Sequence, residues 1–316
     1  MRTAVAVLVA IAVGACSNVP PAGGPPRDEG RGSGRAPAIA DSQARGDGGT
    51  RARGTARVKR GAVVAVVGDA GTGGAAQRSV AARMCRLQQR LGFEVVATTG
   101  DNVYPAGSPD DFAAKFFRPY RCLFARGVRF RASFGNHDVV TDGGDRMVAT
   151  HAFGMKDRYY TFRAGPARFV VLDSTNLDDE QLAWLDRRLD DLRGAPWVVA
   201  VLHHPPYSGG AEHGSDTAVR AILEPRFVSA GVDLVLSGHD HVYSRAETAG
   251  IPYVVTGGGG AAVYPCSPEP PAELVTCRSA HHFVVLEVSK TTLRLRSVGL
   301  GGEMLDRFRL IRERDL

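Results

Sequence analysis

Short apolar runs alternate with longer amphipathic segments from residue 61 onward. A short apolar run bounded by glycine and polar residues is typical of a buried strand, and apolar residues three and four positions apart are typical of one face of a helix. The clearest helical stripe consists of Leu182, Leu185, Leu189 and Leu192. Strands are predicted at Ala62–Val67, Val95–Thr98, Val128–Phe134, Phe169–Leu172, Trp197–Leu202, Val232–Leu236 and Tyr253–Val255, and helices at Ala75–Leu91, Asp110–Phe117, Leu177–Leu192 and Ser215–Gly231.

The C-terminal part changes character, because strand patterns follow one another there without a helix between them. They lie at His282–Val288, Thr292–Val298 and Glu303–Leu310. Strand–helix alternation followed by successive strands predicts an α/β domain in which two packed mixed β-sheets are flanked by helices. We place this domain at residues 61–316.

The N-terminal residues are typical of an export signal. Arg2 precedes an apolar run from Ala4 to Ala15, which is shorter than the roughly 20 residues that a helix needs to span a bilayer. The run ends in Val13-Gly14-Ala15-Cys16, which resembles the lipobox of bacterial lipoproteins. The resemblance implies a signal peptide at residues 1–15, lipidation of Cys16, and an exported protein anchored to a membrane in the periplasm or at the cell surface. The alternative is an ordinary secretory signal cut near Ala15.

Residues 16–60 are rich in Gly, Pro, Ala, Arg and Ser and lack apolar periodicity, which predicts a disordered linker. The first 60 residues hold ten of the 39 Lys and Arg and four of the 33 Asp and Glu. The rest of the chain is therefore balanced, and the formal charge of +6 belongs to the signal and the linker. Because the predicted domain has no net positive charge, no nucleic-acid partner is expected.

Four cysteines follow Cys16. An even number of cysteines in an exported chain permits two disulfides. Cys266 and Cys277 flank a proline-rich loop and form the easier pair. Cys85 and Cys122 lie in predicted helical surroundings, and their pairing stays open.

Polar residues follow five of the predicted strands directly, at the point where each strand ends. In an α/β sheet the carboxyl ends of parallel strands meet at one edge, where ligands bind. Carboxylate, amide oxygen and imidazole together suit Fe, Zn or Mn, so the clusters predict a metal site. The clusters are Gly68-Asp69-Ala70-Gly71, Gly100-Asp101-Asn102-Val103-Tyr104, Gly135-Asn136-His137-Asp138, His203-His204-Pro205-Pro206-Tyr207 and Gly238-His239-Asp240-His241.

These five clusters, in this order, resemble those of the calcineurin-like metallophosphoesterases, and most of all those of the small single-domain purple acid phosphatases of the tartrate-resistant type. The wider superfamily has Asp-x-His as its first motif, but here Gly71 stands two residues after Asp69. The purple branch instead has a tyrosine three residues after the aspartate of the second motif, and Tyr104 stands at that position after Asp101. The resemblance covers roughly residues 61 to 300.

The resemblance implies two metal ions with separate ligand sets. It assigns Asp69, Tyr104 and His241 to an Fe(III) ion. It assigns Asn136, His203 and His239 to a divalent Fe, Zn or Mn ion, and it makes Asp101 the ligand that bridges both ions. His204 matches no ligand of the family, and we expect it to have a structural role.

The resemblance further implies hydrolysis of a small phosphate ester, in which a metal-activated water attacks phosphorus. A nearby acid must then protonate the leaving group. His137 and His213 are our candidates for this acid and for binding the phosphate; the alternative for His137 is that Asp138 orients it to support the loop. Gly257–Gly260 are expected near the metals, where the lack of side chains would leave the cleft open.

An acid phosphatase acting on phosphomonoesters is the function that these residues favour. One alternative is a phosphodiesterase of the same superfamily. Another is a surface lipoprotein that binds metal or phosphate without catalysis. The natural substrate, the second metal and the oligomeric state are left open by the sequence.

Overall fold

The computed structural model describes residues 61–312. The predicted signal peptide, Cys16 and the predicted linker at residues 16–60 lie outside the described residues. Within the described part, no helix is both long and apolar enough to cross a bilayer.

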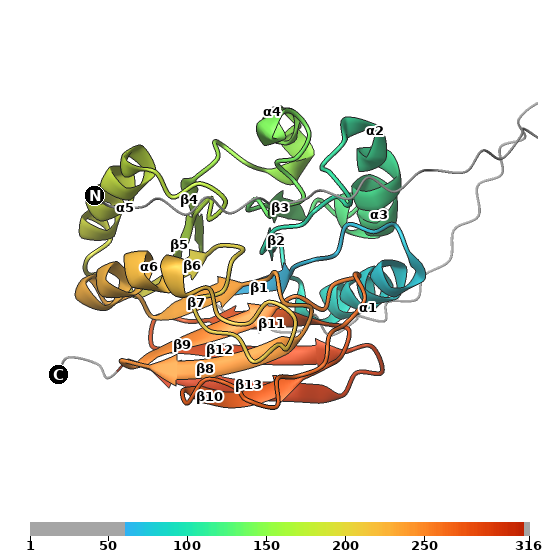
Figure 1. The fold of residues 1–316 in the computed structure, drawn as a ribbon. Coiled ribbons are helices and arrows are strands. Elements are labelled where there is room, and N and C mark those ends of the chain that lie inside the picture. The colour runs from blue at the N-terminus through green and yellow to red at the C-terminus, as the bar shows by residue number, and fades with distance from the viewer. Residues whose placement is uncertain (1–60, 313–316) are drawn as a thin grey trace, which may run out of the picture. The chain divides into compact units, whose positions relative to one another are not determined.

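Two β-sheets form the centre of the fold (Figure 1). The first has the strand order β13-β12-β11-β1-β2-β3, and the second has the order β10-β8-β9-β7-β6-β5-β4. Parallel pairs join β1 to β2 and β2 to β3 in the first sheet, and β5, β6, β7 and β9 in the second. The strands are β1 (Ala62–Val67), β2 (Val95–Thr98), β3 (Arg129–Arg131), β4 (Tyr160–Ala164), β5 (Ala167–Val171), β6 (Trp197–Val201), β7 (Leu234–Ser237), β8 (Tyr243–Thr248), β9 (Ile251–Thr256), β10 (Leu274–Arg278), β11 (His282–Val288), β12 (Thr292–Gly299) and β13 (Met304–Ile311).

Helices lie over part of the outer face of each sheet (Figure 1). Val80 and Met84 of α1 join the main core cluster, whereas Leu185 of α5 and Phe227 of α6 pack in a second cluster against the other sheet. Burying one apolar face of each helix on a sheet accounts for this arrangement of layers. The helices are α1 (Ala75–Leu91), α2 (Pro109–Phe112), α3 (Arg118–Phe124), α4 (Asp145–Ala149), α5 (Asp179–Asp191) and α6 (Thr217–Ala230).

The interface between the two sheets is lined by apolar side chains. Val66 and Leu286 of the first sheet share the main core cluster with Val201, Leu236 and Val254 of the second. All five side chains are fully buried. Each buried isobutyl or isopropyl group of this kind stabilises the fold by about 1.5–3 kcal/mol, so the apolar runs of the sequence hold the two sheets together.

The predicted fold class is confirmed, and so are most predicted elements. The helix expected at Asp110–Phe117 is longer, because α2 continues through a π-helical turn at Ala113–Phe117 into α3. Strands β4, β8 and β10 were not predicted, since their polar and small residues do not form apolar runs. Only Arg129–Arg131 of the run at Val128–Phe134 pairs as a strand.

Both possible disulfides are formed. Cys85 of α1 is bonded to Cys122 of α3, and Cys266 is bonded to Cys277 of β10. The second bond ties the loop that follows β9 to the edge of its sheet.

Candidate metal centre

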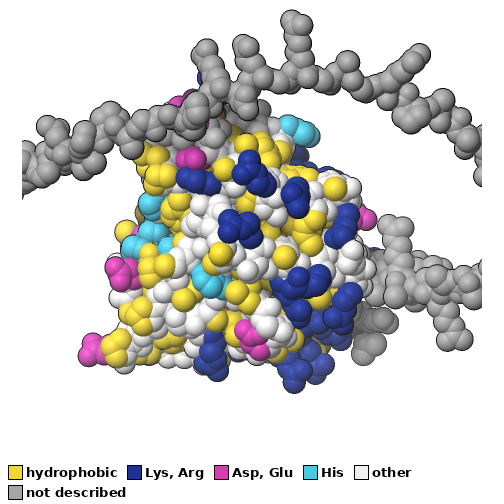
Figure 2. All heavy atoms as spheres, turned by 90° about the vertical axis from the view of Figure 1, so that its right-hand side faces the viewer, with side chains coloured by type: hydrophobic (Ala, Val, Ile, Leu, Met, Phe, Trp, Pro, Cys, Tyr) yellow, Lys and Arg dark blue, Asp and Glu magenta, His cyan; other side chains and the backbone are white. Residues whose placement is uncertain are grey.

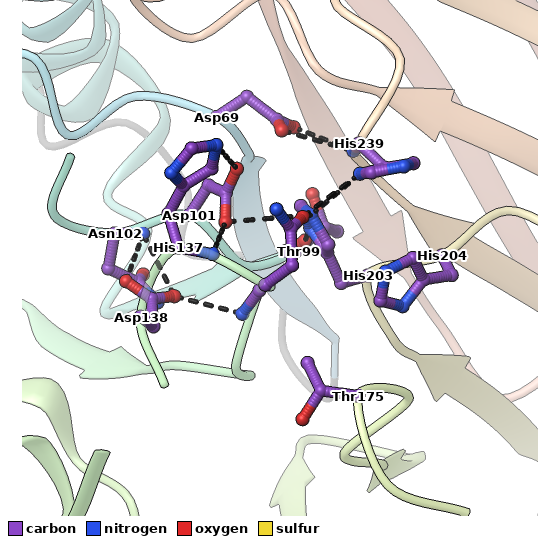
Figure 3. Close-up of polar contacts among 12 residues, drawn as sticks. Asp69, Thr99, Asp101, Asn102, His137, Asp138, Thr175, His203, His204 and His239 are labelled. Atoms are coloured by element: carbon purple, nitrogen blue, oxygen red, sulfur yellow. Dashed lines mark hydrogen bonds and ion pairs between the residues drawn. The ribbon is translucent and has the colours of Figure 1, made fainter. Parts of the chain in front are cut away.

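The polar clusters meet at one edge of the molecule, where β1, β2, β6 and β7 end. Figure 3 shows Asp69, Asp101, His203 and His239 pointing toward one another from separate loops. The backbone is held in the left-handed region at Asp69, Asp101 and His239, with φ of 55°, 50° and 70°. This conformation raises the free energy of a non-glycine residue, so it persists only where the surrounding structure holds it in place. Such residues are concentrated at functional sites.

The first group of donors consists of Asp69, Tyr104 and His241. The Tyr104 hydroxyl lies 3.5 Å from Asp69 Oδ1 and 3.1 Å from His241 Nε2. His241 Nε2 lies 3.6 Å from Asp69 Oδ1, and its other nitrogen, Nδ1, lies 2.8 Å from the carbonyl oxygen of Ala262. A donor bond from Nδ1 to that carbonyl leaves the lone pair of Nε2 facing the other two donors, as metal-binding histidines require.

The second group consists of Asn136, His203 and His239. Asn136 Oδ1 lies 3.0 Å from His203 Nε2 and 3.1 Å from His239 Nδ1, and the two histidine nitrogens are 3.2 Å apart. His203 Nδ1 lies 2.8 Å from the carbonyl oxygen of Thr99, which orients the ring. One amide oxygen and two imidazole nitrogens therefore converge on one point.

Asp101 lies between the two groups. Its Oδ1 is 3.6 Å from His203 Nε2 and accepts a hydrogen bond from the backbone N–H of His137. Glycine is required on both sides of this carboxylate. A Cβ at Gly135 would collide with Asp101, and a Cβ at Gly100, whose φ is 93°, would collide with the His203 ring.

The loops are held by two buried carboxylates that follow the candidate ligands in sequence. Asp138 accepts hydrogen bonds from the backbone N–H groups of Asn102, Val103 and Gly135. Asp240 accepts hydrogen bonds from the backbone N–H groups of His213 and Gly214. Asp138 does not contact the His137 ring in these hydrogen bonds, so it supports the loop backbone directly.

The electrostatics of the site match a requirement for bound cations. Burial, reinforced by Asp101, raises the pKa of Asp69 well above its usual value and the pKa of Asp138 to about 7. Burial and the Asp69 charge also raise the pKa of the Tyr104 hydroxyl. Burial, together with neighbouring imidazoles, lowers the pKa of His239, and burial lowers that of His241. Buried acids crowded together beside neutral imidazoles are the environment that a metal ion stabilises.

The donor set fits two metal ions. Two groups of titratable side chains could hold a cation: the partly buried group of His203, His204 and His239, and the buried group of Asp69, Asp101 and His203. Oxygen and imidazole donors without thiolate suit Fe, Zn or Mn. When bound, such a pair of ions can polarise a phosphoryl group and activate water.

His137 lies beside both Asp101 and Tyr104. Its Nδ1 is 2.7 Å from the carbonyl oxygen of Pro105, and its Nε2 is 4.0 Å from Asp101 Oδ2. The ring centroids of His137 and Tyr104 are 4.6 Å apart. The ring is partly exposed, with 39% of its side-chain area accessible, so it can reach a substrate at the site.

His213 lies on the opposite side of the site. Its ring stacks on His239, with centroids 4.1 Å apart and planes 24° apart. The side chain is exposed. His213 and His137 thus flank the donor groups from two loops, and their assignment as catalytic residues stays a prediction.

His204 lies next to the second group but turns toward a hydroxyl group. Its Nδ1 is 2.9 Å from Ser174 Oγ, and the same hydroxyl accepts hydrogen bonds from the backbone N–H groups of His203 and His204. Burial and the neighbouring His203 lower the pKa of His204 to about 4. The structural role of His204 stays a prediction.

Tyr264 is a site residue that sequence reasoning missed. Its ring stacks on His241, with centroids 4.2 Å and planes 17° apart, and it meets the His213 ring edge to face at 5.7 Å. Its loop is fixed by the bond from Cys266 to Cys277 and by the hydrogen bond from Tyr264 N to the carbonyl oxygen of His241. The one sequence feature that could have indicated Tyr264 is its position two residues before Cys266.

The expectation that Gly257–Gly260 leave the cleft open is wrong. All four glycines are buried. A Cβ at Gly257 would collide with the backbone of Asp240, and a Cβ at Gly259 would collide with the backbone of Gly68. Glycine is needed because this loop packs tightly under the ligand-bearing loops.

The fold and the site together are those of a protein with two packed sheets and a candidate centre for two metal ions. The model of the family described as calcineurin-like phosphoesterase matches residues 62–243. This match covers more than half of the chain, and the chain therefore belongs to that family, as its motifs predicted.

Curated relatives lie in the purple branch of the family. Purple acid phosphatase 22 of Arabidopsis thaliana is 34% identical over 128 residues, which cover 36% of this chain and 30% of that protein. Purple acid phosphatase 1 of Ipomoea batatas is 34% identical over 128 residues, covering 38% of this chain and 27% of that protein. The chain thus spans less than a third of the length of these relatives.

Solved structures share the fold. The purple acid phosphatase PPD1 from yellow lupin (Lupinus luteus) seeds has a TM-score of 0.69 at 19% identity, over 80% of this chain and 54% of that one. GAP50, the anchor in the inner membrane complex of Plasmodium, has a TM-score of 0.71 at 18% identity, over 81% of this chain and 91% of that one.

Proposed function

We propose that the protein is an acid phosphatase that hydrolyses phosphomonoesters at a centre of two metal ions. One observation carries the proposal: two compact groups of three donors lie on either side of Asp101. The neighbouring donors within each group are 3.0 to 3.6 Å apart. This spacing lets one ion be bound by each group and lets the Asp101 carboxylate contact both.

The donor types differ between the two groups, and this difference supports two different metals. Asp69 and Tyr104 supply anionic oxygens, which suit Fe(III). Asn136, His203 and His239 are neutral donors, which suit a divalent Fe, Zn or Mn ion. In such a centre, Asp69, Tyr104 and His241 would hold the ferric ion.

The other residues of the site would act on the substrate. His137 and His213 would donate hydrogen bonds to phosphoryl oxygens or protonate the leaving group. The stack of His213 on His239 limits the orientations of the His213 ring. Tyr264 and His213 lie beside His241 and His239 and are partly or fully exposed, so they could contact the ester group of a substrate.

The test is the hydrolysis of para-nitrophenyl phosphate and bis-para-nitrophenyl phosphate by the metal-loaded protein and by Asp101→Asn. The proposal expects faster turnover of the monoester and a loss of at least about 100-fold in kcat for the variant. The matched control is Asp191→Asn, at an exposed aspartate of α5, which should keep full activity. Preference for the diester would identify a phosphodiesterase, and phosphate binding without turnover would identify a binding protein.

We further propose that the protein is exported and anchored to a membrane through a lipid on Cys16. The support is the apolar run that ends at Cys16. Mass spectrometry of the N-terminal peptide tests this directly, because lipidation adds acyl mass at Cys16 and Cys16→Ser removes it. An unmodified N-terminus after Ala15 would show an ordinary secretory protein.

A further inference from the structure

The two C-terminal strands place arginines opposite one another on one face of the first sheet. Arg294 of β12 pairs with Arg309 of β13, and Arg296 pairs with Arg307. Side chains alternate between the two faces of a sheet, and the alternate residues Leu295 and Phe308 pack toward the core. The four arginines therefore point away from the core, onto the outer face.

Helix α1 adds further positive charge beside these strands. It carries Arg83, Arg86 and Arg90 and has no acidic residue. The Arg83 guanidinium lies against Gly302 in the turn between β12 and β13, so close that a Cβ there would collide with it. We call the outward arginines of β12, β13 and these three of α1 the basic face. Figure 2, which views the side of the molecule that carries α1, shows Lys and Arg side chains gathered at its lower right and others spread over its upper half.

The basic face is poorly compensated by acids. On the outward positions of β11, β12 and β13 the one acidic residue is Glu287, which stands opposite Arg294 and forms an ion pair with Arg296 at 2.8 Å. One further acid, Glu303, lies in the turn between β12 and β13. Among the ion pairs of residues 61–312, none involves Arg294, Arg307 or Arg309. Like charges opposite each other on neighbouring strands destabilise a sheet, so the arrangement is costly without an anionic partner.

Protection of an exposed sheet edge explains only part of the pattern. Charged side chains on an edge strand prevent pairing with other chains, which accounts for Arg307 and Arg309 on β13. It does not account for Arg294 and Arg296, because β12 is paired on both sides.

We propose that the basic face docks on the surface of an anionic lipid bilayer. Two exposed apolar side chains at the ends of β13 support a bilayer rather than a nucleic acid. Ile311 is 59% exposed and lies on the same side of the strand as Arg307 and Arg309, and Met304 at the other end is 46% exposed. Arginines beside exposed aliphatic groups match the boundary between headgroups and acyl chains. Single-stranded nucleic acids are bound with the help of exposed aromatic rings, and the outward positions of these strands carry none.

Docking through this face would leave the metal centre accessible. The candidate ligands lie in loops beyond the ends of the strands, whereas the basic face is formed by the sides of β12, β13 and α1. The basic face shares no residue with the proposed active site, and docking through it does not depend on the proposed catalytic function.

The experiment measures sedimentation of the full-length chain with vesicles of phosphatidylcholine alone or with 30% phosphatidylglycerol, at about 0.1 M salt. All proteins carry Cys16→Ser, so that no lipid contributes to binding. The test variant is R294Q/R307Q/R309Q. The matched control is R163Q/R187Q/R188Q, which removes three exposed arginines from β4 and α5 on the other sheet.

Each arginine near an anionic surface contributes about one kcal/mol, so the test variant should bind the anionic vesicles about 100-fold more weakly than the parent. The control should lose no more than a few-fold. Equal losses in the two triple variants would overturn the proposal, because net charge alone would explain them. Vesicle binding that does not increase with phosphatidylglycerol would overturn the proposal as well. So would tighter binding of a DNA oligonucleotide than of the vesicles by this face.

Discussion

The phenol ring of Tyr264 lies flat against the imidazole ring of His241, with their centroids 4.2 Å apart. The backbone N–H of the same tyrosine donates a hydrogen bond to the carbonyl oxygen of His241. Tyr264 therefore fixes both the backbone and the ring of a candidate ligand to the first metal. This relationship gives Tyr264 a positioning role that can be separated from direct contact with substrate.

Tyr264→Ala is expected to lower kcat for para-nitrophenyl phosphate by about 10-fold, because loss of the groups that orient a ligand costs about 10–100-fold in affinity or activity. Tyr264→Phe should keep most of the activity, since it keeps the ring. Iron content per chain distinguishes positioning from a general folding defect. The control is Tyr159→Ala, which disrupts a ring pair with Trp184 away from the site and should leave both iron content and kcat unchanged.

Tyr104→Phe is expected to abolish the visible colour of an iron-loaded protein. Burial and the Asp69 charge raise the pKa of the Tyr104 hydroxyl, so a tyrosinate can exist there only when a cation neutralises it. An absorption band from tyrosinate bound to Fe(III) should be present in the parent and absent in the variant, as visible spectra will show. A colourless parent protein holding two Zn or Mn ions would remove the ferric assignment while leaving the phosphoesterase proposal intact.

His213→Ala is expected to slow the hydrolysis of substrates with poor leaving groups most. A general acid contributes about 10²–10⁴-fold where the leaving group needs a proton. We expect a loss of about 100-fold in kcat for an alkyl phosphate and of less than 10-fold for para-nitrophenyl phosphate. Equal losses for both substrates would contradict the acid role. His151→Ala, at an exposed histidine, serves as the control.

His282 should make the fold less stable in acid. This histidine is completely buried, and burial lowers its pKa to about 4. The unfolded chain, with an ordinary histidine pKa near 6.5, binds the proton more readily, so stability is complete above about pH 6.5 and falls as the pH drops toward 4. Between pH 7 and pH 5 the free energy of unfolding should fall by about 2 kcal/mol from this group.

Urea unfolding of the parent and of His282→Gln at both pH values measures this effect. The variant should lose about 2 kcal/mol less than the parent between pH 7 and pH 5, whatever its stability at pH 7. His151→Gln, on the surface, should behave as the parent does. An identical pH dependence in the parent and in His282→Gln would show that the buried ring does not titrate.

The sequence predicted the centre of the fold well because its strands are fully buried. A strand such as β1 or β6 is apolar on both faces, and the polar residue after it marks the point where it leaves the core. The edge strand β10 has no apolar run, since most of its side chains are partly or fully exposed. Its position depends on pairing with β8, which no local pattern reveals.

For the site and the basic face too, local sequence patterns could be predicted and contacts between distant segments could not. Asp69, Asp101 and His239 could be found because each directly follows a strand. Tyr264 could not, since a long loop and the bond from Cys266 to Cys277 bring it to His241. The basic face also escaped prediction: the charges of residues 61–316 balance, and only strand register and the packing of α1 separate the positive ones in space.

The candidate ligands are divided between the two sheets. Asp69, Asp101 and Tyr104 belong to loops of the first sheet, and His203 and His239 to loops of the second. Metal ions bound by residues from both sets of loops would link the two sheets at the edge of their interface. Binding to the folded state alone raises stability by about 4 kcal/mol when free metal exceeds its Kd 1,000-fold. A chelator should therefore lower the melting temperature as well as the activity. Metal uptake would stabilise the contact between the two sheets as well as form the catalytic centre.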